Sequence, residues 1–318
     1  MTYDKATLKR MFDGADVSPI LPYDCLIGDA NVALELQKGH GRISISGVQP
    51  KLSMVVSGNV LRLTDVNEQG RYILKPVPNA PHLLETEFLP ENEHISMLIA
   101  EKVFKIETAA CALCYFGNGQ PAYVTRRFDV LPSGAKRAME DLASVAGLTR
   151  HNGGEDYKYN NLSYEECAEL IRNNTKASLV EVLKFFSLVV YNYLICNDDA
   201  HLKNFSLIDR GDGDYGLSPA YDLVNTSLHL FQPQIFALKK GLFKEGMPNL
   251  WIKPIDRQTF LEFGLRIGLP EKTVRRELDR YAAEYEEMNS IIAGSSLSDS
   301  LKESYLNSYT FRRNTLRQ

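Results

Sequence analysis

The sequence predicts an α+β fold with a strand-rich N-terminal lobe and a helical C-terminal lobe. Short β-branched or alternating runs dominate up to about residue 130, and long apolar runs at helical spacing dominate after about residue 160. The 318 residues also exceed the roughly 250–300 at which single cores stop growing. We therefore expect domains at residues 1–133 and 134–318, divided at the turn-rich sequence LPSGAK.

The strands expected in the first lobe form two pairs. RISIS and KLSMVV are joined by GVQP, and VLRLT is followed by RYILK. A helix is expected over residues 92–104, where apolar residues recur at helical spacing and Asn92 is a candidate N-cap. PAYVTRRFDV, at residues 121–130, is a further strand.

The second lobe is expected to be mostly helical. Residues 164–173 and 180–196 read as helices, and the latter is apolar nearly all round, which is typical of a buried helix. A short strand, FSLI, follows it, and helices resume from residue 258. Tyr281 and Tyr285 share a helical face there and are expected in the core.

Composition excludes several classes of protein. The net charge of -4 argues against nucleic-acid binding by the whole surface, because such binding depends on neutralised phosphates. The 5 cysteines are scattered and lack the spacing of a zinc site, so reduced thiols are expected. With neither a signal-peptide core nor an uninterrupted apolar run long enough for a membrane span, the expected location is the cytoplasm.

The most informative segment is NDDAHLKN, residues 197–204, which follows the buried helix. Phosphoryl transfer needs a carboxylate to accept the proton of the attacking hydroxyl and an amide oxygen to help hold magnesium. Protein kinases carry this Asp and Asn on one loop, at the spacing that separates Asp199 from Asn204. The pattern predicts phosphoryl-transfer chemistry on a two-lobed, protein-kinase-like fold.

Other residues follow in the order that a kinase requires. Asp222 lies downstream, where a kinase places its second magnesium ligand, and Mg²⁺ prefers oxygen ligands. Lys75 ends a strand before the helix that carries Glu93, which is the order of the ATP-binding lysine and its acidic partner. Gly47 lies in a turn whose backbone N–H groups could cover phosphates. Each residue alone has an ordinary explanation as a surface charge or turn former, so the prediction depends on the conjunction.

Several motifs together resemble the HipA family of serine/threonine kinase toxins. They span residues 42 to 226 in the family's order, and DxHxKNF followed by P-x-Y-D is the most specific part. The motifs are SISGVQPKL, YILKP, the Asn-Glu pair that opens an apolar helix, RRFDV, EDL, NDDAHLKNFSL and SPAYDLVNT.

The resemblance implies a role for each matching position. Asp199 would be the catalytic base, Asn204 and Asp222 the magnesium ligands, and Lys75 the lysine that contacts the phosphates of ATP. His201 and Lys203 would order the loop or face the phosphates. Arg127, Phe128 and Asp129 would lie by the hinge that holds adenine, and Ser46, Gly47, Val48 and Gln49 would form the glycine loop.

The same resemblance implies self-modification. HipA-like kinases autophosphorylate a serine at the start of the glycine loop; Ser44 is the aligned position and Ser46 a second candidate. A phosphoserine beside the triphosphate would repel the nucleotide, so modification should lower activity. The sequence leaves open which serine is modified first.

The resemblance also implies partners. The protein substrate would be an aminoacyl-tRNA synthetase, which makes the chain a growth-inhibiting toxin. Only about 40 residues precede the glycine loop, so the chain looks like the shorter HipT-type member of a three-part system. A small HipS-like protein and a DNA-binding HipB-like antitoxin are then the expected partners.

Two other functions stay open from the sequence. Lipid and small-molecule kinases use similar catalytic loops, so the acceptor class is not fixed by the motif. A degenerate kinase used as a binding module is the non-enzymatic alternative. The presence of Asp199, Asn204, Asp222 and Lys75 argues against it, because a scaffold has no need of every phosphate and magnesium group.

Overall fold

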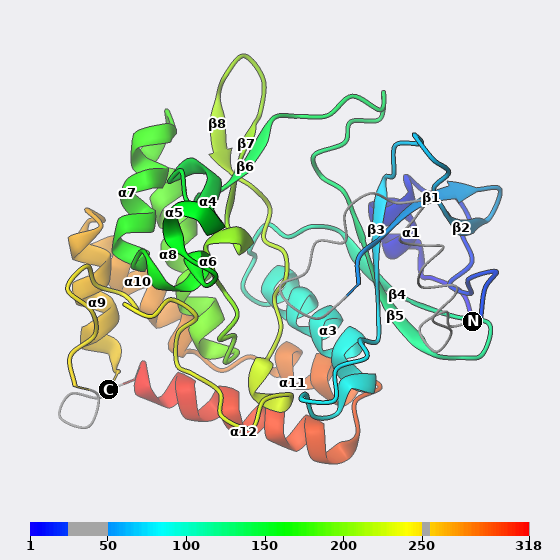
Figure 1. Cartoon of the computed structure of the whole chain (residues 1–318). Coiled ribbons are helices and arrows are strands. Elements are labelled where there is room, and N and C mark those ends of the chain that lie inside the picture. The colour runs from blue at the N-terminus through cyan, green and yellow to red at the C-terminus, as the bar shows by residue number, and fades with distance from the viewer. Residues whose placement is uncertain (25–49, 250–254, 318) are drawn as a thin grey trace. The chain divides into compact units, whose positions relative to one another are not determined.

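The computed structural model describes residues 1–24, 50–249 and 255–317 (Figure 1). The chain divides into two compact units. The first consists of Met1–Ile95, Ala109–Ala135 and Ser295–Leu297, and the second of Ser96–Thr108, Lys136–Gly294 and Ser298–Gln318. Residues 96–108, which the expected boundary at 133/134 assigns to the first domain, therefore cluster with the second unit.

The first unit contains a five-stranded antiparallel sheet in the order β2-β1-β3-β5-β4. The hairpin between β1 and β2 turns at Gly58, whose φ of 60° suits a residue without a side chain. The strands are β1 (Leu52–Ser57), β2 (Val60–Leu63), β3 (Tyr72–Pro76), β4 (Cys111–Tyr115) and β5 (Pro121–Arg126).

Helix α1 (Lys5–Phe12) packs on this sheet and was not expected from the sequence. Its N-cap is Asp4, whose side chain accepts a hydrogen bond from the N–H of Thr7. Phe12 is buried and lies 5.3 Å from Tyr72, ring centre to ring centre. The helix therefore covers part of the apolar core formed by the sheet.

Helix α3 (Leu89–Lys102) begins earlier than expected, directly after the 3-10 turn η2 (Thr86–Phe88). Asn92 consequently lies inside the helix and is fully buried, so the prediction that it is the N-cap is wrong. In the second unit, the carbonyl of Ser96 accepts the Tyr191 hydroxyl, and the Ser96 hydroxyl bonds to the Tyr305 hydroxyl at 2.8 Å.

The second unit is built around α8, which is buried along most of its length as its apolar sequence predicts. Helix α7 packs against it, and Phe185 of α8 lies 5.1 Å from the ring of Phe205 just beyond the catalytic-loop candidate. The helices are α4 (Leu142–Val145), α5 (Arg150–Gly153), α6 (Tyr157–Asn160), α7 (Tyr164–Asn174), α8 (Ser178–Leu194), α9 (Arg257–Arg266), α10 (Glu271–Ala282), α11 (Glu286–Ala293) and α12 (Asp299–Thr315).

A small antiparallel sheet, in the order β6-β7-β8, flanks these helices. Its hairpin is tied to α8 by Glu181, whose side chain is 1% exposed. The Glu181 carboxylate accepts two hydrogen bonds from Arg210 and one from the N–H of Leu217. The strands are β6 (Met139–Asp141), β7 (Ser206–Asp209) and β8 (Tyr215–Leu217), and the 3-10 turns are η3 (Leu202–Asn204) and η4 (Thr226–Leu228).

The continuous helical face expected through Tyr281 and Tyr285 is interrupted. Tyr281 is fully buried, as predicted, but α10 ends at Ala282 and Tyr285 caps α11 in an extended conformation. The Tyr285 hydroxyl turns back to the carbonyl of Arg280 at 2.9 Å.

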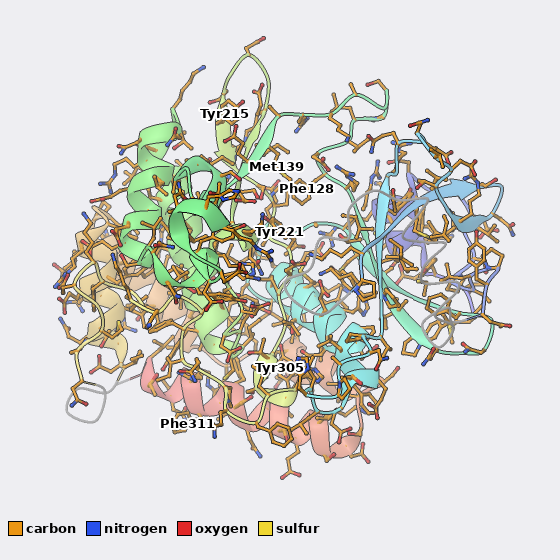
Figure 2. The ribbon with its side chains drawn as sticks, in the orientation of Figure 1. Phe128, Met139, Tyr215, Tyr221, Tyr305 and Phe311 are labelled. Atoms are coloured by element: carbon orange, nitrogen blue, oxygen red, sulfur yellow. The ribbon has the colours of Figure 1, made fainter. Side chains whose placement is uncertain are left out.

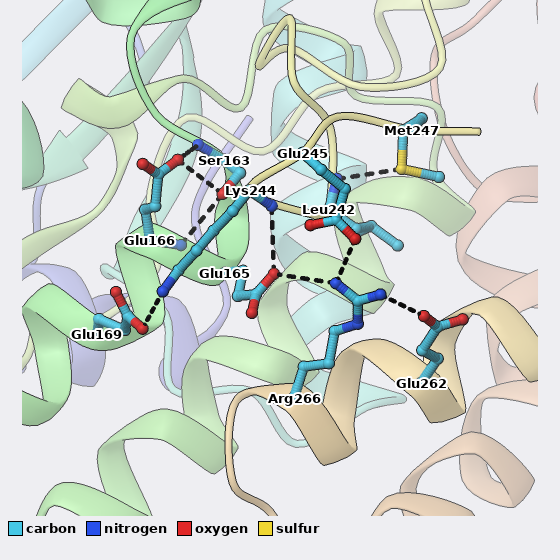
Figure 3. A network of polar contacts seen from close by, with 10 residues as sticks. All are labelled: Ser163, Glu165, Glu166, Glu169, Leu242, Lys244, Glu245, Met247, Glu262 and Arg266. Atoms are coloured by element: carbon cyan, nitrogen blue, oxygen red, sulfur yellow. Dashed lines mark hydrogen bonds and ion pairs between the residues drawn. The ribbon is translucent and has the colours of Figure 1, made fainter. Parts of the chain in front are cut away.

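A polar network joins α7, α9 and the segment at residues 242–247 (Figure 3). Arg266 of α9 bonds to Glu245 and Glu262 and lies 3.7 Å from Glu165. Lys244 bonds to Glu169 through its ammonium and to Glu165 through its backbone N–H.

Across the described ranges, we find no helix with the length and apolar character needed to cross a bilayer.

Candidate active site

The first unit holds a buried ion pair between Lys75 and Glu93. Lys75 Nζ lies 2.5 Å from Glu93 Oε1, and each side chain is only 5% exposed. Charged side chains are almost never buried to this degree unless they are paired. The lysine and glutamate that the sequence singled out thus meet in the folded chain, and this pair marks them as more than solvated surface charges.

The position of this pair follows from its two elements. Lys75 is next to last in β3, opposite Tyr123 in the register with β5, and its ammonium lies 5.3 Å from the centre of the Tyr123 ring. Glu93 lies in the second turn of α3, on a part of the helix that is buried. Regular secondary structure therefore fixes both backbones, and the side chains meet without an irregular loop.

The segment after β5 also forms the local pair that its sequence suggests. Arg127 Nε donates to Asp129 Oδ1 at 2.9 Å, and a second guanidinium nitrogen contacts Oδ2. Asp129 is buried, whereas Phe128 between them is half-buried. This bidentate pair gives residues 127–129 a defined conformation. The predicted contact of this segment with adenine stays a prediction.

In the second unit, the predicted catalytic loop begins at a strained residue. α8 ends at Leu194, and Cys196 has a φ of 56°, a conformation that a non-glycine residue seldom adopts. The Thr226 hydroxyl donates to the Cys196 carbonyl at 2.7 Å and accepts from the N–H of Asp198 at 2.9 Å. The loop is thus held at its start by hydrogen bonds and not by regular structure.

Asn197 connects the loop to Asp222. Its side chain is 3% exposed, and its Nδ2 donates to Asn192 Oδ1 at 2.7 Å and to the Asp222 carbonyl at 3.3 Å. Its Oδ1 accepts from the N–H of Asp199 at 3.2 Å. One buried amide therefore contacts the backbones of both acids that the sequence predicts to be functional.

Asp199 combines partial burial with one exposed face. Its Oδ1 accepts a hydrogen bond from the Tyr159 hydroxyl at 2.6 Å, and the side chain is 35% exposed. Burial, with the negative charges of Asp222 and Asp198, raises the pKa of Asp199 to about 6, while Tyr159 and Lys158 act in the opposite direction. A carboxyl group with a pKa near the operating pH is suited to accept a proton.

Asn204 closes the loop onto Asp199. It ends η3, and its Nδ2 donates to the Asp199 carbonyl at 3.2 Å. Its backbone N–H donates to the carbonyl of His201 at 2.9 Å. Because the amide nitrogen faces Asp199, the side-chain oxygen is directed elsewhere and is the atom that a hard cation would use.

Asp222 has a φ of 55°, so it too adopts a conformation that is uncommon outside glycine. Strained residues of this kind persist where the surrounding contacts fix them, and they cluster at functional sites. The preceding Tyr221, labelled in Figure 2, donates to the Lys203 carbonyl at 2.9 Å and pairs with Ser206 at 2.6 Å. Those bonds attach the Asp222 segment to the end of the predicted catalytic loop.

The two other predicted loop residues, Lys203 and His201, differ in exposure. Lys203 is 40% exposed and lies 3.2 Å from Asp141, the N-cap of α4. Burial opposes the charged form, but Asp141 and Tyr157 outweigh it and raise the pKa of Lys203. His201 is buried, and its Nε2 lies 3.0 Å from Lys158 Nζ. Since an ammonium group only donates, that ring nitrogen is the acceptor.

Sequence reasoning did not single out Tyr157, Lys158 and Tyr159 of α6, or Asn197. The α6 residues belong to a turn-rich segment without hydrophobic period, so only the concentration of tyrosine among polar residues hinted at a role. Of the predicted site residues, Ser44, Ser46, Gly47, Val48 and Gln49 lie outside the described residues.

The chemistry of these side chains fits magnesium. Asn204 and Asp222 offer oxygen donors, and no group of three or more His, Cys, Asp or Glu side chains suited to a metal occurs in the described part of the chain. Mg²⁺ is commonly bound by only one or two protein carboxylates, with substrate phosphates and water as its other ligands. Two oxygen-bearing side chains are therefore sufficient for an ion that arrives with a nucleotide.

Comparison with known proteins gives consistent relatives. The model of the HipA-like C-terminal domain family matches residues 43–288. A candidate kinase of Haemophilus influenzae is 30% identical over 87% of this chain and 81% of its own length. The HipA serine/threonine-protein kinase toxin of Shewanella oneidensis is 27% identical over 78% of this chain and 57% of its own length.

Solved structures agree on the fold. HipA in the Shewanella oneidensis complex with HipB and operator DNA superposes with a TM-score of 0.66, at 23% identity, over 87% of this chain and 65% of that one. The Helicobacter pylori proinflammatory kinase CtkA superposes with a TM-score of 0.53, at 14% identity, over 86% of this chain and 90% of that one. The predicted α+β, kinase-like fold is confirmed, and the chain belongs to the HipA-like C-terminal domain family.

Proposed function

We propose that this chain is a magnesium- and ATP-dependent serine/threonine protein kinase. The observation that carries the proposal is the buried amide of Asn197, which contacts the backbones of both Asp199 and Asp222. A candidate proton acceptor and a candidate magnesium ligand are thereby held by one side chain. That connection has no evident use in a protein that only binds another.

In this mechanism the chain mainly positions groups and supplies charge. Asp199 accepts the proton of the acceptor hydroxyl as the new bond to the γ-phosphorus forms and the bond to the leaving oxygen breaks. Asn204 and Asp222 would hold magnesium, which neutralises charge on the phosphates. Lys75, held by Glu93, would contact the phosphates of ATP. The segment at Arg127, Phe128 and Asp129 would contact adenine.

The relatives suggest a biological role. One is a HipA toxin, and a HipA structure contains HipB and operator DNA. We infer for this chain a role as a growth-inhibiting toxin with a DNA-binding, HipB-like antitoxin, and an aminoacyl-tRNA synthetase as its substrate. A small HipS-like partner and autophosphorylation of Ser44 or Ser46 stay predictions.

Labelling of a cell extract from the host organism tests the proposal. Purified chain is added with Mg²⁺ and γ-labelled ATP, and labelled species are separated into protein, lipid and small molecules and identified by mass spectrometry. Label on protein serine or threonine is expected with the wild type and not with Asp199→Asn. Label confined to lipid or small molecules would reassign the acceptor, and equal labelling by both chains would refute the proposal.

A further inference from the structure

Three consecutive side chains of α6 interact with three polar residues of the 197–204 loop, two of them through direct contacts and one electrostatically. The Tyr159 hydroxyl donates to Asp199 Oδ1, and Lys158 Nζ lies 3.0 Å from His201 Nε2. Tyr157 helps to raise the pKa of the Lys203 ammonium group, so the two side chains interact electrostatically. The Tyr159 ring also meets the His201 ring edge-on, with centres 5.0 Å apart. Each polar side chain of the D-x-H-x-K motif, Asp199, His201 and Lys203, thus interacts with a different side chain of α6.

α6 is itself held firmly. The carbonyl of Tyr159 accepts the backbone N–H of Lys239 at 2.9 Å, and the Asn161 side chain donates to the carbonyls of Gly153 and Tyr157. α5 approaches so closely at Gly153 that an added Cβ would lie 2.5 Å from the Cβ of Tyr157. The segment is therefore a fixed support for its three side chains.

Two explanations of the Tyr159 contact must be separated. A hydroxyl that donates to a catalytic carboxylate has the position of an acceptor hydroxyl, so Tyr159 could compete with substrate. A competitor needs to contact Asp199 alone, however, whereas α6 also contacts His201 through Lys158 and acts electrostatically on Lys203 through Tyr157. The bond also uses only Oδ1 of a side chain that is 35% exposed, and a carboxylate has a second oxygen for the acceptor.

We propose that Tyr159 is a positioning residue, which holds the Asp199 carboxylate in its reactive orientation through Oδ1 while the other oxygen receives the acceptor proton. The inference rests on the proposed kinase function and deepens it. Burial and the Asp199 charge raise the pKa of Tyr159 far above its ordinary value, so the hydroxyl keeps its proton and always donates. Lys158 contributes by lying over the Tyr159 ring, 4.8 Å from its centre.

Tyr159→Phe tests this role because it removes only the hydroxyl. ADP release from Mg-ATP is measured in the full-length chain, so that transfer to protein, to the chain itself or to water is counted. We expect kcat to fall on the order of 10-fold or more, which is the lower end of the loss that follows when the hydrogen-bond partner of a metal-ligating side chain is removed. The KM for ATP should stay within about twofold, since the phenol holds the base and not the nucleotide.

Tyr285→Phe is the matched control, because it removes a hydroxyl that donates to the carbonyl of Arg280, away from the 197–204 loop in the sequence and in its contacts. It should leave kcat and KM unchanged. Gly153→Ala perturbs α6 without touching the loop, and it should lower kcat with the same small effect on KM. Thermal denaturation establishes that each variant is folded.

The outcomes separate this inference from the function on which it rests. A wild type that releases ADP no faster than Asp199→Asn would overturn both. If the wild type releases ADP much faster than Asp199→Asn, and Tyr159→Phe releases it as fast as the wild type or faster, the positioning role alone would be overturned. A variant faster than the wild type would identify Tyr159 as a competitor of the acceptor. A parallel loss of kcat and ATP affinity in Tyr159→Phe would also overturn it, as general damage to the site.

Discussion

The Lys75–Glu93 pair and the 197–204 loop are both polar, but they are built in different ways. The pair sits on a strand and a helix, and each side chain is 5% exposed. The loop lies outside regular structure except for the short η3 turn, and it leaves Asp199 35% exposed. Cys196, which precedes the loop, and Asp222, which is hydrogen-bonded to it, both have a positive φ. The first site is fixed by secondary structure and the second by side-chain hydrogen bonds.

This difference predicts how each site fails. Removal of one member of a buried ion pair leaves an uncompensated charge in the core, which costs stability. A partly exposed carboxylate on a polar loop can be neutralised with little effect on packing. Stability and activity should therefore be coupled at Lys75 and separable at Asp199.

The largest effect is expected from Lys75→Met. The buried Glu93 carboxylate then loses its partner, and the free energy of unfolding should fall by roughly 3–5 kcal/mol. The double variant Lys75→Met, Glu93→Leu should recover most of that loss, because apolar side chains of similar volume can replace a buried pair, yet it should transfer no phosphate. Urea denaturation and ADP release measure the two properties. Recovery of phosphate transfer in the double variant would contradict the proposal that Lys75 contacts the phosphates of ATP.

The opposite pattern is expected from Asp199→Asn. The loss of the proton acceptor should reduce the rate of phosphate transfer on the order of 100-fold or more. The amide keeps the shape of the side chain, so the midpoint of urea denaturation should stay close to that of the wild type. A large loss of stability in this variant would show that Asp199 also stabilises the fold. Stability and activity would then be coupled at both sites, and the contrast between them would disappear.

Much of the fold could be predicted from the sequence where a period extends over enough residues. The expected strands at 60–64 and 71–75 and the expected helices at 164–173 and 180–196 correspond to β2, β3, α7 and α8 within one or two residues at each end. The short strand β4 was missed, because its sequence CALCY has few residues in which alternation can be recognised.

For the candidate site, the sequence predicts which residues take part and their order along the chain, but not the contacts between them. Asp199, Asn204 and Asp222 were found because their spacing is local and chemically demanding. Tyr159 is separated from Asp199 by 40 residues, and α6 has four residues and no hydrophobic period. Its contact depends on tertiary packing that includes Gly153 and Lys239, which single-sequence patterns do not encode.

A smaller effect, shared between stability and activity, is expected from Asn197→Ala. Three hydrogen bonds of a 3% exposed amide are lost, and the buried Asn192 side chain loses a partner. An unsatisfied buried polar group costs roughly 1–3 kcal/mol, so urea denaturation should show a loss of that size. Phosphate transfer should fall as well, because Asp199 and Asp222 lose their common support. The control is Asn174→Ala, which removes one exposed hydrogen bond to Leu170 and should be nearly neutral.

The smallest effect is expected at Glu181, which is as buried as Glu93 but has no proposed part in the chemistry. Burial alone would raise the pKa of Glu181, but the hydrogen bonds from Arg210 and the N–H of Leu217 outweigh it and hold this pKa below its ordinary value. A carboxyl whose pKa is lowered by folding stabilises the protein above its unfolded pKa of about 4.3, and this contribution is lost as the pH falls through the folded value.

Glu181→Gln should therefore reduce the difference in unfolding free energy between pH 7 and pH 4, because the glutamine cannot titrate. Urea denaturation at the two pH values measures that difference, and ADP release at pH 7 measures activity. The hairpin of β7 and β8 still has its ladder to β6, so phosphate transfer should stay near the wild-type rate. An acid dependence as steep as that of the wild type would mean that other carboxyl groups dominate it. A loss of phosphate transfer comparable to that of Lys75→Met would show that any buried ion pair supports activity through stability alone. The Lys75–Glu93 pair would then have no separate role in the chemistry.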